Sequence, residues 1–469
     1  MKPSIPQGTR DFSADTVRKR NYILQTIRKI FELYGFEPLE TPAMENLDTL
    51  LGKYGQEGDK LIFRILNNGL DNPAKQEQAR NDFEMILSGK NSKGITERAL
   101  RYDLTIPFAR YVAMNHGQLS FPFKRYQMQP VWRADRPQKG RYREFYQCDA
   151  DVVGSYSLVN EVELAALYTK AFKQLRIPVD IRINNRKVLA ALANCCGGAG
   201  HMNDITVAID KLDKIGADKV IDELRQKGLN DDQLMLVEKY LSISGTEAEK
   251  LAQAELLLGH EEEGRKGIDE LKYVIEYFTA GQGHALNAGQ GTDKLTIDFT
   301  LARGLNYYTG TIFEVKAIGV QMGSIGGGGR YDDLTGLFGV KGIPGVGISF
   351  GVDRIYDVME ELQLMPASIV KGTKALFFNL GETESRYAYS LMQQLRENGI
   401  SCELYHEKAK FDKQFKYAEK KNIPYAVIIG TEEMNSRTAV VKNLSKGTQV
   451  SVGYEELAEL LRLETDGQG

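Results

Sequence analysis

Basic side chains gather in residues 133–145, Arg-Ala-Asp-Arg-Pro-Gln-Lys-Gly-Arg-Tyr-Arg-Glu-Phe, and their chemistry is that of an anion site. Guanidinium groups bind phosphate oxygens in a forked geometry and stay charged at working pH. Strand-like patterns on both sides, within residues 121–153, make this segment the loop of a hairpin. The segment therefore indicates binding to a phosphate or to an RNA backbone, with a solvated surface hairpin as the alternative that composition leaves open.

A second candidate is the segment 301–310, Leu-Ala-Arg-Gly-Leu-Asn-Tyr-Tyr-Thr-Gly. Arg303 follows an apolar strand pattern, and an arginine in that place is costly to bury unless it meets an anion. Tyr307 and Tyr308 add two hydroxyl groups on rigid rings beside it. The same residues would also suit a strand end followed by a turn, so the segment alone does not decide between the two interpretations.

Two further segments carry weaker signals. Glycines are frequent between residues 326 and 351, and they would let a ligand approach the backbone closely. Arg354 comes directly after them at the start of a predicted helix, where the helix N-terminus would help to bind an anion. Near the C-terminus, Lys413, Lys416 and Lys420 share one helix face, which suits an RNA backbone and is equally typical of a solvated face.

Several other chemistries lack their signatures in this chain. It has no GxxxxGK[ST] loop, no dinucleotide fingerprint, no HExxH motif and no nucleophile elbow. Its four cysteines include no CxxC pair, which argues against a structural zinc site and a disulfide framework. The sequence therefore predicts non-covalent chemistry that relies on arginines, glycines and paired tyrosines.

The elements that must position these residues follow from apolar spacing. Residues 17–34 predict an amphipathic helix, because their isoleucines fall on one stripe. Residues 36–41 predict an extended segment, and the polar residues 67–98 predict a surface insertion with one short helix. Helical spacing dominates residues 187–278, after which strand patterns resume at 295–301 and 311–315.

A boundary at residues 366–372 separates the chain into two parts. Beyond it, strands alternate with helices, which predicts a small α/β domain with a mainly parallel sheet. We therefore expect an α+β protein. Its expected domains are a strand-rich domain over residues 1–365, containing a mainly helical insertion at about 187–280, and an α/β domain over residues 372–469.

The bulk properties limit the surroundings of the protein. The 469 residues carry a formal net charge of −3, which argues against wholesale coating of DNA or RNA but allows a local basic surface. No apolar run approaches the roughly 20 residues that a membrane helix needs, and the N-terminus lacks the apolar stretch of a secretory signal. We therefore expect a soluble, cytoplasmic protein with neither a membrane nor DNA as its partner.

The order of these segments resembles the class II aminoacyl-tRNA synthetases. Residues 36–42, 133–145 and 345–354 look like motifs 1, 2 and 3 of that class, and residues 301–308 look like the signature of its histidine-specific family. The Pro-Gln-Gly-Thr-Arg-Asp opening at 6–11 and the later Gly-Gly-Arg-Tyr-Asp also match. The likeness runs nearly end to end, so the chain as a whole resembles the histidyl-tRNA synthetase family.

This resemblance implies a six-stranded antiparallel catalytic sheet, a homodimer built through motif 1 and a C-terminal anticodon-binding domain. It implies that histidine reacts with ATP to give histidyl-adenylate and pyrophosphate, with Mg²⁺ bridging the phosphates through ligands that the sequence does not identify. Transfer of histidine to the 3′ end of tRNA(His) would follow. Histidine, ATP and tRNA(His) are thus the implied partners.

The resemblance also implies the roles of individual residues at the ATP site. Arg133 would hold the α-phosphate, and Arg141 and Arg354 the γ-phosphate. Phe145 would stack on adenine, and Asp135 stands where the general class II pattern has Glu.

The implied catalytic residues are Arg133 and Arg303. Arg303 is the distinctive residue of the family, and it would bind the α-phosphate and stabilise charge as the carboxylate attacks.

The implied amino-acid pocket combines carboxylates with hydroxyl groups. Asp103, Thr105 and Gln147 would bind the α-amino group, and Asp151 and Tyr308 would each contact one nitrogen of the imidazole, which has one donor and one acceptor. The implied histidine-binding residues are Asp103, Thr105, Gln147, Asp151, Tyr307 and Tyr308.

Three other interpretations compete with this one. The first is a non-catalytic relative that serves as a regulatory subunit in histidine biosynthesis. Such relatives lose motif residues, whereas Arg133, Arg303 and Arg354 are all present here. The second is a synthetase for another amino acid, such as threonine or proline, against which the Arg-Gly-Leu-Asn-Tyr-Tyr signature argues. The third is a plain RNA-binding or scaffolding protein, which would not need the full set of ATP-site residues.

Overall fold

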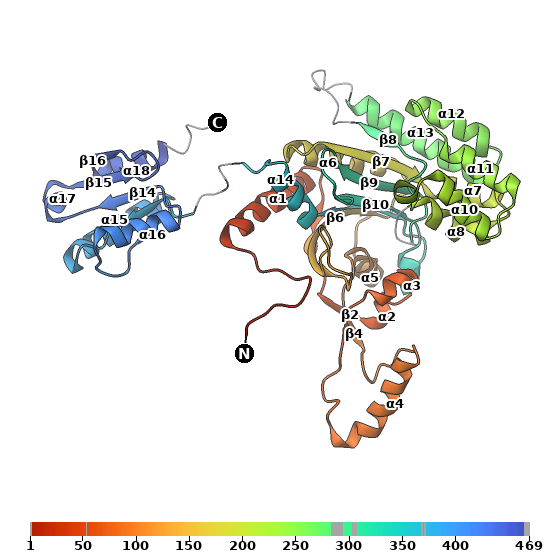
Figure 1. Ribbon diagram of the computed structural model, residues 1–469, viewed down its shortest axis with the longest axis horizontal. Helices are drawn as coiled ribbons and strands as arrows, with labels where there is room; N and C mark the ends of the chain where they lie inside the picture. The colour runs from red at the N-terminus through yellow and green to blue at the C-terminus, as the bar shows by residue number, and fades with distance from the viewer. Residues whose placement is uncertain are drawn as a thin grey trace. The chain divides into compact units, whose positions relative to one another are not determined.

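A computed structural model describes residues 2–52, 54–282, 294–302, 307–366, 369 and 372–463 (Figure 1). The chain divides into two compact units, Met1–Met365 and Pro366–Gly469.

The first unit is organised around one large sheet. Its strands are β1 (Glu37–Pro38), β5 (Phe123–Trp132), β6 (Glu144–Val153), β7 (Val179–Asn185), β8 (Leu295–Ile297), β9 (Thr311–Ala317), β10 (Gly326–Tyr331) and β11 (Gly345–Gly351). They are ordered β1-β5-β6-β11-β10-β9-β7-β8. Every pair between β5 and β7 is antiparallel, which confirms the expected six-stranded antiparallel core. The short edge strands β1 and β8 each pair in parallel with their neighbour.

Two parts of this sheet test the sequence patterns directly. Strands β5 and β6 form the predicted hairpin, with Trp132 opposite Glu144 where the loop begins and ends. The glycine run at 326–329, for which no strand is predicted, forms most of β10. Glycine has a low preference for strands. Here β9 and β11 pair with this segment from both sides, and that pairing overrides the local preference.

Three helices share an apolar core with the sheet: α1 (Ala14–Leu33), α6 (Val159–Gln174) and α14 (Val352–Glu361). The predicted helix at 17–34 starts earlier than expected because the Ser13 side chain caps it, accepting a hydrogen bond from the Thr16 amide at 3.3 Å. Cys148, Ala150 and Val152 of β6 belong to this core. Side chains alternate along a strand, so the intervening residues of β6 face the opposite side of the sheet, where the candidate site lies.

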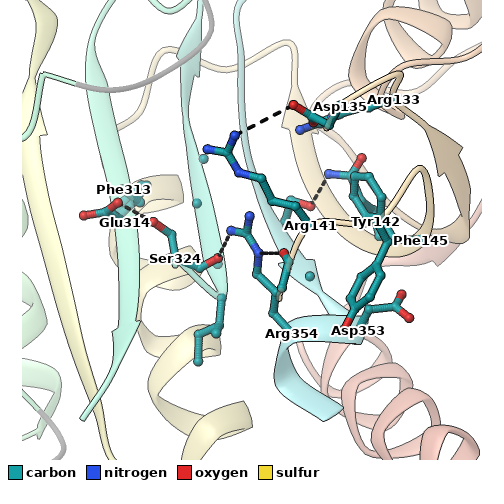
Figure 2. A pocket seen from close by; sticks show the side chains of 18 of the residues that line it. Arg133, Asp135, Arg141, Tyr142, Phe145, Phe313, Glu314, Ser324, Asp353 and Arg354 are labelled. Carbon is teal, nitrogen blue, oxygen red and sulfur yellow. Dashed lines mark hydrogen bonds and ion pairs between the residues drawn. The ribbon is translucent and has the colours of Figure 1, made fainter. Parts of the chain in front are cut away.

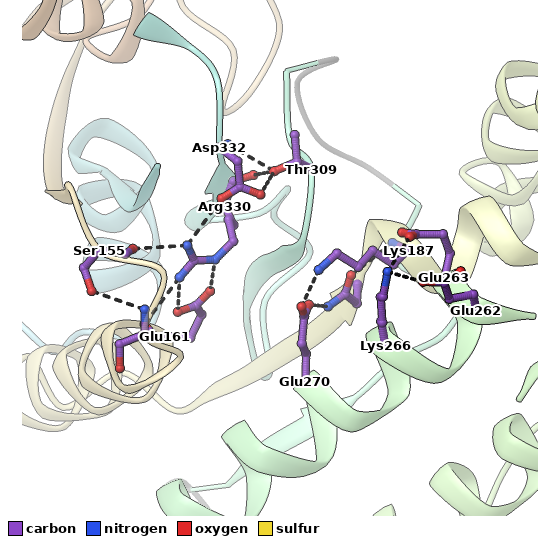
Figure 3. A network of polar contacts seen from close by, with 12 residues as sticks. Ser155, Glu161, Lys187, Glu262, Glu263, Lys266, Glu270, Thr309, Arg330 and Asp332 are labelled. Atoms are coloured by element: carbon purple, nitrogen blue, oxygen red, sulfur yellow. Dashed lines mark hydrogen bonds and ion pairs between the residues drawn. The ribbon is translucent and has the colours of Figure 1, made fainter. Parts of the chain in front are cut away.

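The predicted helical block is confirmed. Its helices are α7 (Arg186–Cys195), α8 (Met202–Ile209), α9 (Leu212–Ile215), α10 (Ala217–Gln226), α11 (Asp231–Leu241), α12 (Glu247–Leu258) and α13 (Glu262–Gln282). They lie together beside β7 and β8 in Figure 1 and share one apolar core with the sheet. Lys187 also forms an ion pair with Glu270 where α7 meets α13 (Figure 3).

A smaller sheet, ordered β2-β4-β3, lies below the large one in Figure 1. Its strands and the helices around it are β2 (Met44–Asn46), β3 (Arg64–Ile65), β4 (Arg98–Leu100), α2 (Leu47–Leu50), α3 (Gly55–Lys60), α4 (Gln76–Leu87) and α5 (Thr105–Asn115). The insertion between β3 and β4 contains α4 and a three-residue 3₁₀ turn, and α4 has no buried residue. The prediction of a surface insertion with one short helix is therefore confirmed.

The second unit contains a five-stranded sheet ordered β13-β12-β14-β15-β16. Its elements are β12 (Ala375–Phe377), α15 (Glu382–Glu397), β13 (Cys402–Leu404), α16 (Phe411–Lys420), β14 (Tyr425–Ile428), α17 (Thr431–Ser436), β15 (Thr438–Asn443), β16 (Gln449–Gly453) and α18 (Tyr454–Leu463). The α/β class is confirmed, but a mainly parallel sheet is wrong. β12 pairs in parallel with β13 and β14, whereas β14-β15 and β15-β16 are antiparallel. The short connection between β15 and β16 allows only a hairpin, and parallel strands need a longer crossover.

Candidate active site

A cavity of about 330 Å³ opens on the face of the large sheet opposite the helices α1 and α6 (Figure 2). The β5–β6 loop, strands β6, β9, β10 and β11, and the start of α14 line it. We call this cavity the phosphate cleft. The predicted site residues that line it are Arg133, Asp135, Arg141, Phe145, Gln147, Tyr308 and Arg354. All five residues predicted for ATP are therefore brought together here from segments more than 200 positions apart.

The arginines of the phosphate cleft are oriented by backbone carbonyl groups. Arg354 donates from Nε to the Gly140 carbonyl and from Nη1 to the Ser324 carbonyl, both at 2.6 Å (Figure 2). Arg133 donates from Nε to the Tyr102 carbonyl at 3.1 Å. A carbonyl group fixes the direction of a guanidinium without cancelling its charge. These contacts orient both guanidinium groups at the wall of the cleft, and guanidinium groups suit a polyphosphate.

The N-terminal segment holds the loop and α14 together. Asp353 accepts hydrogen bonds from Arg10, from Arg20 and, at 2.9 Å, from the Tyr146 amide. The amide of Arg143 in the loop donates to the Gly8 carbonyl at 2.9 Å. Asp353 directly precedes Arg354, so these contacts fix where the Arg354 side chain begins. The sequence patterns predict the helix that contains Asp353 but not this anchoring role.

Buried carboxyl groups lie beside the phosphate cleft. Asp103 accepts hydrogen bonds from the hydroxyls of Tyr54 at 3.0 Å and Tyr307 at 3.2 Å, and from the Ile106 amide at 3.1 Å. The Thr105 hydroxyl also lies near the Tyr307 hydroxyl and opposes the rise that burial gives to the pKa of Tyr307. Asp103 and Thr105, both predicted for the amino acid, therefore meet Tyr307 in one network.

Asp151 occupies a second network on β6. It forms an ion pair with Arg125 at 3.0 Å and accepts a hydrogen bond from the Tyr331 hydroxyl at 2.5 Å. Together with Asp149, these residues and the Asp103 network make up what we call the carboxylate cluster. The members of the carboxylate cluster are Tyr54, Asp103, Arg125, Asp149, Asp151, Tyr307 and Tyr331.

Two glycines make room for the predicted imidazole contacts. A Cβ atom at Gly347 would lie 2.0 Å from Oδ1 of Asp151, and a Cβ atom at Gly329 would lie 2.9 Å from the ring of Tyr308. Real Cβ contacts do not come this close, so only glycine lets these two side chains lie flat on the sheet. The glycine-rich pattern of the sequence is thus explained by close approach of side chains to the backbone.

Burial disfavours the charged form of the acids in the carboxylate cluster. It raises the pKa of Asp103 and Asp151 above the ordinary range and that of Asp149 to about 7. Arg125 opposes the rise for both Asp149 and Asp151. The cluster has three acids and one arginine, so it is suited to a ligand that brings a positive charge or N–H donors.

The structure leaves one predicted residue undescribed and adds others that the patterns missed. Arg303 lies outside the described residues, so its predicted role is not tested. Arg125 was missed because nothing local marks it, and Tyr331 was missed because the resemblance includes its segment without giving it a role. Asp149 follows Gln147 by two positions and precedes Asp151 by two, so the period of a strand could have placed all three on one face.

The antiparallel core, the arginine-bearing loop and the helix that presents Arg354 define the catalytic unit of a class II aminoacyl-tRNA synthetase. A family model for histidyl-tRNA synthetase matches residues 92–355, and one for an anticodon binding domain matches residues 371–464. The chain belongs to the histidyl-tRNA synthetase family.

Curated relatives and solved structures agree with this assignment. Histidine–tRNA ligases of Flavobacterium johnsoniae and Bacteroides fragilis are 53% and 51% identical to this chain. These matches cover 98% and 97% of this chain, and 99% and 98% of the relatives. The crystal structure of histidyl-tRNA synthetase from Nostoc sp. PCC 7120 is 32% identical with a TM-score of 0.80, covering 99% of this chain and 100% of that one.

Proposed function

We propose that this protein is a histidine–tRNA ligase, which activates histidine with ATP and transfers it to tRNA(His). The observation that carries the proposal is the adjacency of the phosphate cleft and the carboxylate cluster on one face of the sheet. The phosphate cleft accommodates a polyphosphate, and the carboxylate cluster accommodates an amino acid with a cationic group and an imidazole. Tyr308 lines the cleft and lies against Gly329 beside the cluster, so the two ligands meet there.

In the first step, a carboxylate oxygen of histidine attacks the α-phosphorus of ATP. A bond forms between that oxygen and phosphorus, and the bond to the β-phosphate bridge breaks, releasing pyrophosphate. Arg133 and Arg303 stabilise the charge on the α-phosphate, while Arg141 and Arg354 hold the γ-phosphate. The chemistry needs no covalent enzyme intermediate, because positioning and electrostatic stabilisation supply the rate.

The adenine ring stacks on Phe145, which lines the cleft, and Asp135 lies beside Arg141 with 3.9 Å between their charged groups. This contact is weak and Arg141 is half exposed, so a phosphate can compete for Arg141.

Histidine occupies the carboxylate cluster. Its α-ammonium meets Asp103, Thr105 and Gln147, and its imidazole lies between Asp151 and Tyr308. A pocket with buried polar groups rejects analogues that leave those groups unpaired, so selectivity needs no second, hydrolytic site. Tyr307 orients Asp103 through its hydroxyl group.

Mg²⁺ accompanies ATP in this proposal. Asp135 and Glu314 both line the phosphate cleft, and carboxylate oxygens together with phosphate oxygens are the ligands that Mg²⁺ prefers. They lie on opposite sides of the cleft (Figure 2), so each would hold an ion together with phosphate oxygens and not with the other carboxylate. When bound, the ion supplies neutralisation of the phosphate charge during attack.

The second step transfers the activated histidine to the tRNA. A ribose hydroxyl at the 3′ end of tRNA(His) attacks the carbonyl carbon of the adenylate, and AMP leaves. We assign residues 1–365 as the catalytic domain, with the helical insertion at about 187–280, and residues 372–469 as the anticodon-binding domain. Lys413, Lys416 and Lys420 on α16 are candidates for the RNA backbone.

The protein acts as a homodimer in the cytoplasm in this proposal. Leu33 and Met44, which flank the motif 1 segment, are exposed apolar side chains suited to burial in a subunit interface. No helix among the described residues has the length and apolar character to cross a membrane.

The proposal is tested by pyrophosphate exchange. The purified protein should exchange labelled pyrophosphate into ATP only when histidine is supplied, and it should charge tRNA(His). An Arg303→Ala variant should fold and still bind histidine while exchange falls by roughly 10²–10³-fold. Exchange that another amino acid supports, or no exchange at all, would refute the proposal.

A regulatory, non-catalytic role is the second candidate. The structure of an ATP phosphoribosyltransferase regulatory subunit/histidyl-tRNA synthetase from Bacillus halodurans has a TM-score of 0.71 to this chain, which at 20% identity shows a shared fold alone. The five arranged ATP-site residues favour catalysis, and the exchange assay separates the two roles.

A further inference from the structure

Asp149 belongs to the carboxylate cluster and lies on β6 next to Gln147, which lines the phosphate cleft. It follows Gln147 and precedes Asp151 on the same face of β6, and Ser349 of β11 is its direct partner across the sheet. Only 2% of Asp149 is exposed, and its Oδ1 has no hydrogen-bond partner among the described residues. A buried acid without a full set of partners is costly, so its retention calls for a role.

Ser349 connects Asp149 to Gln147. Ser349 lies directly across the sheet from Asp149, on the same face, and its hydroxyl favours the ionised carboxylate and so lowers the pKa of Asp149. Nε2 of Gln147 donates to Oγ of Ser349 at 2.9 Å. An ionised carboxylate only accepts, so the Ser349 proton must point toward Asp149. The Ser349 oxygen is then left to accept from Gln147, as the geometry requires. The direction of each bond in this relay is therefore set by Asp149.

The far end of the relay is the amide oxygen of Gln147. Gln147 lines the phosphate cleft, and its Oε1 is buried with no hydrogen-bond partner among the described residues. Because Nε2 is committed to Ser349, Oε1 is the amide atom left for a ligand. An acceptor in this place suits an N–H donor, whereas a reversed amide would present hydrogens.

We propose that Asp149 is a positioning residue for the amino-acid substrate: acting through Ser349, it orients the Gln147 amide so that Oε1 accepts a hydrogen bond from the α-ammonium group. This inference rests on the proposed function and adds a residue to it. Asp149 itself does not touch the substrate. Its loss would let the Gln147 amide reverse and direct its NH₂ group at the ammonium.

The charges around Asp149 make the relay sensitive to pH. The charged groups near it are Arg125 on β5, Arg101, Asp151 on the same strand and Asp103 beside α5. Tyr308 is a further titratable group, and β11 contributes the Ser349 hydroxyl. Burial raises the pKa of Asp149 to about 7. A protonated Asp149 can donate to Ser349, as an asparagine can, so the relay should weaken in the wild type as the pH falls below about 7.

The test compares two ligands that differ only in the ammonium group. Histidine is measured as substrate in pyrophosphate exchange, and 3-(imidazol-4-yl)propionate, which lacks the amino group, is measured as a competitive inhibitor. Asp149→Asn should raise the KM for histidine roughly 10- to 100-fold, as expected for a lost hydrogen bond to a charged group. The inhibition constant of the propionate and the KM for ATP should stay unchanged.

Further variants separate positioning from general damage. Ser349→Ala removes the uncharged hydroxyl that connects Asp149 to Gln147, and it should raise the KM for histidine while leaving the inhibition constant of the propionate unchanged. This variant tests the inference even if Asp149→Asn fails to fold. The double variant should be no worse than the single ones, because both act on one relay. The ratio of variant to wild-type KM should shrink from pH 8 to pH 6. Glu45→Gln is the matched control, because Glu45 is a buried carboxylate paired with Arg110 outside the site.

Two results would overturn the inference. One is an unchanged KM for histidine in Asp149→Asn and Ser349→Ala. The other is an equal loss of affinity for histidine and for the propionate, which would mean that Asp149 supports the whole pocket or contacts the imidazole. Failure of the proposed function is distinguished beforehand, because the wild type would then show no histidine-dependent exchange.

Discussion

The phosphate cleft and the carboxylate cluster adjoin on one face of the same sheet, yet their charged groups are held in different ways. In the cleft, Arg133 and Arg354 are oriented by carbonyl groups, and Arg141 is half exposed. In the cluster, Asp103 and Asp151 are almost fully buried and bonded to tyrosine hydroxyls. The phosphate cleft is therefore suited to a charged ligand that stays partly hydrated when bound. The carboxylate cluster is suited to select its ligand through buried hydrogen bonds.

This difference has a consequence for mutations. A cleft arginine bonds backbone carbonyl groups that water can also satisfy, so we expect its loss to lower the free energy of unfolding only slightly. A cluster residue is part of a buried network, so its loss affects both the ligand and the fold. The comparison would fail if variants in the two regions changed activity and stability in the same proportion.

The largest expected effect is on catalysis in the phosphate cleft. Arg133→Ala should lower pyrophosphate exchange by roughly 10²–10³-fold, because it removes charge stabilisation at the α-phosphate. The melting temperature should be nearly unchanged, which circular dichroism can check. Arg136→Ala is the matched control, since Arg136 is exposed on the same loop and does not line the cleft. Equal losses in the two variants would show that the loop charge as a whole, rather than Arg133, matters.

A smaller but broader effect is expected in the carboxylate cluster. Asp151→Asn should raise the KM for histidine and also lower the free energy of unfolding by about 2–3 kcal/mol. Removing one partner of a buried ion pair usually lowers the free energy of unfolding somewhat more than this. The loss should be smaller here because Asp149 still compensates the charge of Arg125. Denaturant unfolding and histidine titration measure the two effects. A variant that loses histidine binding at full stability would place Asp151 with the cleft residues, against the comparison.

The smallest expected effect is on the pH dependence of stability. The pKa of Asp149 is raised to about 7 in the folded protein, so the native state binds more protons than the unfolded state between about pH 4 and pH 7. Its contribution to stability is present at low pH and is lost as the pH rises through 7. An Asp149→Asn variant has no carboxyl group at this position, so it should not lose this part of the free energy of unfolding as the pH rises.

Thermal unfolding at pH 5 and pH 8 measures the effect. The melting temperature of Asp149→Asn minus that of the wild type should become more positive by about 2–4 °C from pH 5 to pH 8. Glu45→Gln should show no such change between the two pH values. A difference that becomes more negative would mean that Asp149 is better stabilised as an anion than its burial indicates.

Much of the fold could be predicted because it depends on local patterns. The helix α1 follows from isoleucines spaced at three and four positions, and the β5–β6 hairpin from two strand patterns around a polar loop. Five ATP-site residues were predicted from their type and from the resemblance. The parallel arrangement expected for the second sheet was wrong because alternation of strands and helices does not report which strands become neighbours.

The residue types alone set the chemistry available at each segment: arginines for phosphate, carboxylates and hydroxyls for a polar amino acid, and glycines where a side chain must lie against the backbone. Which of these residues meet depends on how the strands pair in the folded protein. Arg125, Asp151 and Gly347 stand in one row because β5, β6 and β11 pair in a particular register. A shift of one residue would turn each side chain to the other face, so no local pattern contains this information.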